Sequence, residues 1–172
     1  DLSSLNKNID IIYRNYKKKI NKSTLLSLKD FCRKQKRKFY ISNDIKLAKK
    51  LNIDGVYIPS FNKNLNFLNS TSRKNFSIIG SAHNIRELNI KRLQGCSAVI
   101  FSRLFKVSNP LKKGFMGVIK FNLFKLSRKE NLVPLGGINL SNLNKLKMVK
   151  SNSFALLSEI KKKPAKLFNR LF

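Results

Sequence analysis

The residues best suited to chemistry are two adjacent glycines, Gly136 and Gly137, that follow the apolar run Leu132–Leu135. Such a run is typical of a buried parallel strand. Glycines after a strand let backbone N–H groups approach a ligand closely, because no Cβ is in the way. We expect a helix to begin at Asn139, where unpaired N–H groups would add donors for an anion. The pattern indicates a phosphate site, and an ordinary loop turn is the alternative.

Other reactive side chains stand where further apolar runs end. Arg14 closes the first run, where its guanidinium could hold a phosphate through two parallel hydrogen bonds or remain a solvated charge. Ser81 and His83 follow the fourth run, and His83 is the single histidine of the chain. Imidazole can move protons near neutral pH, although a lone histidine is more often a structural hydrogen-bonding group. Ser158 closes the last run and offers a further hydroxyl.

The fifth apolar run leads into a long basic loop, Arg103–Gly114, which contains Lys106 and ends in glycine. Loops of this type fold over anionic substrates. Carboxylates are scarce, because the chain has 8 acidic residues and no strand end carries a pair of them. We expect Asp44 to cap a helix. A divalent metal would therefore find few ligands.

The elements that must position these groups alternate between short apolar strands and amphipathic helices. This alternation predicts βα units around a parallel sheet in a single domain over 1–172, either an open doubly wound sheet or a closed (β/α)₈ barrel. Ligands bind at the carboxyl ends of the strands in both folds. The expected strands are Asp10–Arg14, Lys38–Ser42, Asp54–Ile58, Phe76–Ser81, Ala98–Ser102, Leu132–Gly136 and Phe154–Ser158. The expected helices are Ser23–Gln35, Asp44–Leu51, Asn84–Leu93, Phe115–Leu126, Asn139–Val149 and Lys161–Phe172.

The composition narrows the class of partner. The formal charge is +29 in 172 residues, yet the lysines are spread evenly and accompany heavy use of Asn, Ile, Phe and Leu, as AT-rich coding produces. We therefore interpret the charge as attracting anionic small molecules, and we do not expect a nucleic-acid partner. Cys32 and Cys96 lack CxxC spacing, which indicates free thiols in a reducing cytoplasm. No apolar run reaches the roughly 20 residues of a membrane span, and the chain begins at Asp1 without Met.

Taken in order, these segments resemble the thiamine phosphate synthase and TenI family. The resemblance spans nearly the whole chain and implies the fold of a (β/α)₈ TIM barrel. It also implies one further strand before Asp10, which is missing here and favours a truncated start. The matching segments are Ile12–Arg14, Lys46–Ala48, Asp54–Tyr57, Ile79–Asn84, Phe101–Ser102, Leu104–Lys106, Leu135–Ile138, and Phe154–Ala155 with Ser158.

The resemblance implies a role for each site residue. In the synthase, the thiazole nitrogen of a thiazole phosphate attacks the methylene carbon of a pyrimidine diphosphate, and pyrophosphate leaves with help from magnesium. Arg14 would hold the diphosphate, and Ser81 would contact it or the reacting centre. The residues of this chain that would bind substrate are Arg14, Ser81, Lys106, Gly136, Gly137 and Ser158, the last three at the thiazole phosphate.

The chain departs from the family at the metal site. Ser42-Asn43 stands where the synthase has Asn-Asp, and Asn62 stands near a second aspartate of the family. Two amides in place of two carboxylates remove negative charge that magnesium prefers. The sequence therefore predicts weakened magnesium binding and no other cofactor.

Three functions remain open. The first is the synthase, a transferase that uses phosphorylated thiazole and pyrimidine molecules. The second is a metal-independent thiazole tautomerase, as in TenI proteins, with His83 as the proton carrier. The third is a non-catalytic regulator that binds thiamine phosphate. The sequence does not determine which of these holds, nor the oligomeric state.

Overall fold

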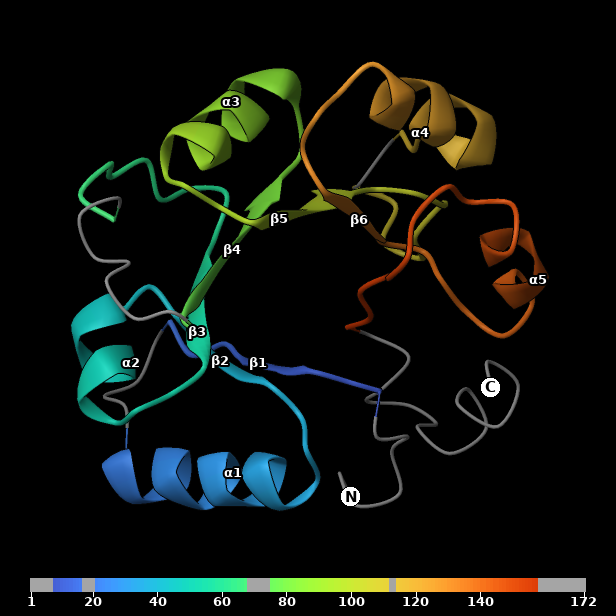
Figure 1. Ribbon diagram of the computed structural model, residues 1–172. Coiled ribbons are helices and arrows are strands. Elements are labelled where there is room, and N and C mark those ends of the chain that lie inside the picture. Colours follow the sequence, from blue (N-terminus) through green and yellow to red (C-terminus); the bar gives the residue numbers. More distant parts are fainter. Residues whose placement is uncertain (1–7, 17–20, 68–74, 112–113, 158–172) are drawn as a thin grey trace.

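The computed structural model describes residues 8–16, 21–67, 75–111 and 114–157. Within these residues, parallel strands alternate with helices except between the third and fourth strands, which follow each other directly, and Figure 1 shows the strands curling into an arc with the helices on its outer side. The strands are β1 (Ile11–Tyr13), β2 (Phe39–Ser42), β3 (Gly55–Ile58), β4 (Ser77–Ala82), β5 (Ala98–Ser102) and β6 (Leu132–Leu135). The helices are α1 (Lys22–Lys34), α2 (Ile45–Lys50), α3 (Ile85–Leu93), α4 (Gly117–Leu126) and α5 (Leu143–Leu146).

The order of the strands decides between the two folds that the sequence allowed. Every strand pairs in parallel with the next one in the chain, so the order is β1-β2-β3-β4-β5-β6. A doubly wound sheet would reverse direction at a switch point, whereas a barrel progresses in one direction. The predicted barrel fold is therefore confirmed, in the described residues, as a curled partial (β/α) barrel.

Alternate residues along each strand face opposite sides of this sheet. On the inner, concave side lies a small cluster of Tyr40, Tyr57 and Ile100, against which Ile79 and Leu135 pack. On the outer side, two larger apolar clusters join the sheet to its helices. One lies under α1 and α2, and the other lies under α3, α4 and α5. The helices are thus held on one face, and the inner face remains for the site.

Acidic side chains accept hydrogen bonds from backbone N–H groups where a helix or a strand begins. Asp44 caps α2 as predicted, because its Oδ1 accepts a hydrogen bond of 2.8 Å from the Leu47 N–H. Asp10 and Asp54 accept hydrogen bonds from the N–H groups of Lys38 and Phe39, before the strands begin. Asp10 and Asp54 directly precede β1 and β3, at the end of the strands opposite to the expected ligand site, so we assign them a structural role.

The structure corrects two predicted elements near the C-terminus. The helix predicted over Asn139–Val149 is only Leu143–Leu146, because Asn139 and Asn142 accept hydrogen bonds from nearby N–H groups through their side chains. The strand predicted over Phe154–Ser158 is reduced to a single bridge between Leu135 and Ala155. Ser158 and the helix predicted over Lys161–Phe172 lie outside the described residues.

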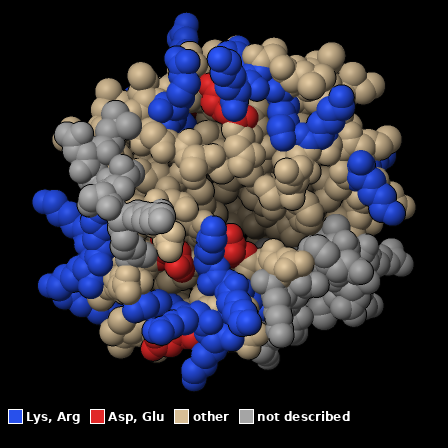
Figure 2. Space-filling view, in the orientation of Figure 1, with Lys and Arg blue, Asp and Glu red and all other residues tan. Residues whose placement is uncertain are grey.

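The surface charge is scattered. In Figure 2, lysine and arginine lie around the outline of the visible face and also in its lower part, where acidic residues accompany them, and the hollow near the centre is lined mainly by uncharged residues. This face does not show the single basic stripe typical of a nucleic-acid site. Within the described ranges, none of the helices has the length and apolar character needed to cross a membrane.

Candidate functional site

Hydroxyl groups line the inner face of the sheet where the strands end. Ser81 lies two residues after the inner residue Ile79, and Ser102 lies two residues after Ile100, so both face inward. Tyr57 comes from the neighbouring strand, and its hydroxyl donates a buried hydrogen bond of 2.8 Å to Ser81 Oγ. This places Ser81 at the carboxyl ends of the strands, as the sequence predicted.

Arg14 lies beside this hydroxyl pair. Its Nε donates a hydrogen bond of 3.0 Å to the Tyr16 hydroxyl, and its guanidinium carbon is 5.3 Å from the Tyr16 ring centroid and 5.6 Å from the Tyr57 centroid. Both rings attract a guanidinium through their electron-rich faces and so restrain its position. Burial raises the pKa of Tyr16, and Tyr57 adds to the rise, so the phenol stays neutral. Arg14 is exposed and open to a ligand.

His83 is held at the end of β4 by two contacts. Its Nδ1 lies 2.6 Å from Ser102 Oγ, and its backbone N–H donates to Glu87 Oε2 at 2.7 Å. It also borders a largely apolar cavity of about 600 Å³ beside the start of α3, whose other walls include Phe101, Met116 and Phe124. His83 therefore has a fixed ring and access to open space.

Gly136 and Gly137 pack against the loop that follows β5. Both have positive φ, +102° and +70°, and the Phe105 N–H donates to Gly136 O at 2.9 Å. A Cβ on Gly137 would come within 2.4 Å of the carbonyl oxygens of Phe105 and Lys106. This close approach explains why glycine stands there without reference to a ligand, which is the alternative that the sequence left open.

The helix start expected after these glycines offers fewer N–H donors to a ligand than predicted. The N–H groups of Asn139 and Ser141 already donate to the Oδ1 atoms of Asn142 and Asn139, at 2.9 and 3.0 Å. The helix that follows has four residues and begins only at Leu143. A phosphate at this turn would therefore be held by other groups than a helix N-terminus.

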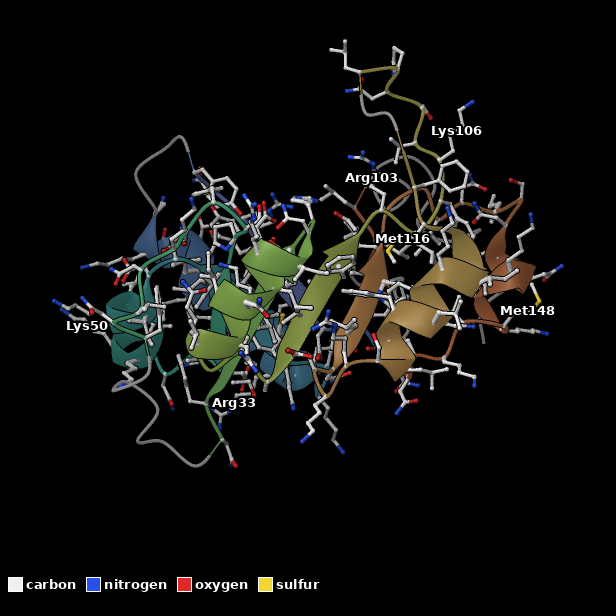
Figure 3. The ribbon with its side chains drawn as sticks, turned by 90° about the horizontal axis from the view of Figure 1, so that it is seen from above. Arg33, Lys50, Arg103, Lys106, Met116 and Met148 are labelled. Atoms are coloured by element: carbon white, nitrogen blue, oxygen red, sulfur yellow. The ribbon has the colours of Figure 1, made fainter. Side chains whose placement is uncertain are left out.

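Lys106 lies on the basic loop after β5. Figure 3 shows Arg103 and Lys106 on the part of the chain that projects from one end of the sheet. A cavity of about 520 Å³ is bounded there by Lys106 to Pro110, Gly114 and Phe115. Ser158, predicted for the same region, lies outside the described residues. The structure thus brings Arg14 and Ser81 together around Tyr57, and it places Lys106 with the two glycines in a separate group.

Asn43 and Asn62, which the resemblance places near the family's metal ligands, contact each other. Asn62 Nδ2 donates to Asn43 Oδ1 at 2.9 Å, and Asn62 Oδ1 accepts from the Asn64 N–H at 2.9 Å. Asn43 is left-handed, with φ of +64°, a conformation that asparagine adopts more readily than most residues. The loops after β2 and β3 are thereby joined through neutral amides.

These residues do not fit magnesium. Both amide oxygens already accept hydrogen bonds, and neither carries the negative charge that a hard cation prefers. Among residues 8–16, 21–67, 75–111 and 114–157, no three His, Cys, Asp or Glu side chains group together as metal ligands. The donor set instead suits an anion, since amide N–H groups and Arg14 can all donate to phosphate oxygens.

Sequence reasoning missed Tyr57, Ser102, Lys91 and Gln94. The first two could have been found, because each lies on the inner side of a strand at its carboxyl end. Lys91 and Gln94 are fully buried polar residues of the α3 region. Nothing in their sequence context separates them from the exposed residues of an amphipathic helix.

Comparison with known proteins agrees with the fold. A family model described as thiamine monophosphate synthase matches residues 8–160. The thiamine-phosphate synthase of Pelagibacter ubique is 29% identical over 174 residues, covering 96% of this chain and 83% of that protein. That of Prochlorococcus marinus is 27% identical over 139 residues, covering 77% of this chain and 38% of that protein. A solved thiamine phosphate pyrophosphorylase from Pyrococcus furiosus shares the fold, with a TM-score of 0.66 and 16% sequence identity. The match covers 87% of this chain and 72% of the chain of that protein.

Proposed function

This chain belongs to the thiamine monophosphate synthase family, and from that premise we propose that it binds phosphorylated thiazole and pyrimidine molecules in thiamine biosynthesis. The observation that carries the proposal is the placement of Arg14 against the Tyr57–Ser81 pair at the carboxyl ends of the strands. Anionic substrates bind at that end of a (β/α) barrel. The high positive charge of the chain, +29, favours their approach.

Arg14 holds the diphosphate of the pyrimidine substrate in this proposal. Tyr16 occupies its Nε, so the terminal nitrogens are directed to phosphate oxygens in a two-point grip. Ser81 donates a further hydrogen bond through its hydroxyl, which already accepts from Tyr57. Gly136, Gly137, Lys106 and Ser158 are proposed for the thiazole phosphate, on the resemblance alone.

The proposed reaction joins the two substrates. The thiazole nitrogen attacks the methylene carbon of the pyrimidine, a C–N bond forms, the C–O bond to the diphosphate breaks, and pyrophosphate leaves with the electron pair. Arg14 neutralises charge that gathers on the leaving group. Because the amides of Asn43 and Asn62 do not suit a divalent cation, we expect substrate binding to be independent of magnesium.

Titration tests this proposal. Thiazole phosphate, thiamine phosphate and the pyrimidine diphosphate are added to the full chain with and without magnesium, and binding is followed by calorimetry. We expect micromolar to millimolar binding that is unchanged by magnesium, and formation of thiamine phosphate when both substrates are present. Absence of binding by all three compounds would overturn the proposal.

A second candidate, the metal-independent tautomerase, is favoured by the short contact between His83 Nδ1 and Ser102 Oγ. This contact fixes the ring and leaves Nε2 to remove a proton from a thiazole phosphate carboxylate and return it elsewhere on the ring. Substitution His83→Ala should abolish isomerisation of that substrate, and Ser102→Ala should reduce it. Full turnover by His83→Ala excludes this candidate.

A further inference from the structure

Lys91 is a charged residue with no solvent exposure. It lies on α3, and its Nζ donates to Pro59 O at 2.8 Å, Asn62 O at 2.7 Å and Gln94 Oε1 at 2.8 Å. All three acceptors are neutral oxygens. Burial of an ammonium without an opposing charge among its partners costs free energy, which indicates that its position has a use. Burial lowers the pKa of Lys91, as expected where water does not reach the charge.

Gln94 completes the arrangement from one turn further along. Its Nε2 donates to Asn62 O at 3.0 Å and to Asn64 O at 2.7 Å, so Asn62 O accepts from both side chains. Gly80 makes room for the lysine stem, since a Cβ there would lie 2.7 Å from Lys91 Cδ. Lys91 and Gln94 together, called the α3 clamp below, fix the backbone of the loop after β3 at three carbonyls, those of residues 59, 62 and 64.

The loop that the clamp holds contacts the loops after β1 and β2. Asn62 donates to Asn43 after β2, as described above. Phe61 packs edge-on against Tyr16, with ring centroids 5.4 Å apart and planes at 81°. Tyr16 in turn accepts the hydrogen bond from Arg14. A shift of this loop would therefore move Asn43 and the ring that orients Arg14.

We infer that Lys91 and Gln94 are positioning residues, which hold the loop after β3 so that Arg14 and the Asn43–Asn62 pair form one diphosphate subsite. The inference rests on the proposed function for the identity of the ligand. It extends that function because it identifies residues on the outer side of the sheet that position the loop at the site. The buried ammonium beside Asn62 also opposes a second cation there, which agrees with the absence of carboxylates at Asn43 and Asn62.

The first test measures the loop itself and needs no ligand. Lys91→Met keeps the apolar stem and removes the charge, and Arg92→Met is the matched control because Arg92 is exposed on the same helix. We expect faster amide hydrogen exchange over residues 60–64 in Lys91→Met and no change in Arg92→Met. Gln94→Leu, which keeps the ammonium, should give the same local effect and serves if Lys91→Met fails to fold. Unchanged exchange in both clamp variants overturns the inference.

The second test separates positioning from general stability. Inorganic pyrophosphate and thiazole phosphate are titrated into each variant, and we expect about a tenfold loss for pyrophosphate alone. The thiazole phosphate is proposed to bind at Lys106, Ser158 and the two glycines Gly136 and Gly137, so its affinity should stay unchanged. Equal losses for both anions, or none for pyrophosphate, contradict a positioning role. If the wild-type chain binds neither anion, the proposed function fails and the subsite with it, whereas the exchange result still shows whether the clamp holds the loop.

Discussion

The loops after β1, β2 and β3 and the loops after β5 and β6 are held by different physical means. The first group is joined by side chains: the Asn43–Asn62 amide pair, the ring contact of Tyr16 with Phe61, and the α3 clamp. The second group is joined by backbone, through Phe105 N–H to Gly136 O and the close packing of Gly137 on two carbonyl oxygens.

This difference determines how each region responds to substitution. Side chains that bond to one another can be exchanged for others of similar size, and such an exchange alters the charge of the site while the loops keep their path. A backbone contact without room for a Cβ permits glycine alone. The first group of loops therefore tolerates substitutions that change the charge of the site, whereas the second group tolerates little change because its backbone path depends on glycine.

The largest effect should come from Gly137→Ala. The added methyl would meet two carbonyl oxygens at 2.4 Å, and alanine disfavours the φ of +70°. We expect a loss of about 3 kcal/mol in the free energy of unfolding, measured by urea denaturation. Gly117→Ala is the control, because Gly117 has φ of +72° with nothing within 4 Å of a Cβ. It should lose only the conformational part, about 1 kcal/mol, and equal losses in the two variants would refute the packing argument.

A smaller effect is expected for Tyr57→Phe in the side-chain-held region. It removes the buried hydrogen bond to Ser81 and keeps the ring that faces Arg14. We expect a loss of about 1–2 kcal/mol in unfolding free energy. Tyr13→Phe should change stability by less than about 0.5 kcal/mol, because the Tyr13 hydroxyl accepts only a long bond of 3.4 Å from Asn15. Anion affinity that collapses in Tyr57→Phe would mean that the hydroxyl, and not the ring, supports Arg14.

A pH titration tests whether the Cys96 thiol, which lies near Lys91, is buried away from water. Burial raises the pKa of the Cys96 thiol from 9.0 to about 12, while Lys91 opposes the rise. Between these values the folded chain keeps the proton and the unfolded chain loses it, so the free energy of unfolding falls as pH rises from 9 towards 12. The slope is at most about 1.4 kcal/mol per pH unit. Cys96→Ala should show a shallower decline than wild type, and identical declines would contradict the burial of this thiol.

An effect of similar size is expected from restoring charge at the amide pair. The double variant Asn43→Asp/Asn62→Asp should gain a magnesium-dependent rise in thermal midpoint, worth about 1.4 kcal/mol at ten times Kd. Asn66→Asp adds a carboxylate to the same loop and should gain none. The wild-type chain should not respond, and a saturable magnesium response in wild type would show that neutral amides suffice.

The candidate site could be predicted in part. The position of Arg14, Ser81 and His83 at one edge of the sheet could be predicted, because the carboxyl ends of parallel strands meet at one edge whatever the curvature of the sheet. The separation of Arg14 and Ser81 from Lys106 and the two glycines could not be predicted, since it depends on which loops contact each other. The helix expected over Asn139–Val149 was wrong because local side-chain hydrogen bonds of Asn139 and Asn142 outweighed its apolar periodicity.

The sequence by itself determined the succession of βα units, since apolar runs and amphipathic periods are local properties that each segment carries alone. It also determined that amides, and not carboxylates, stand at positions 43 and 62. Only the tertiary structure decided that the strands pair in chain order and that Lys91 reaches two carbonyls of a distant loop. A buried ammonium and an exposed one have the same letter in a sequence, and only the packing around α3 distinguishes them.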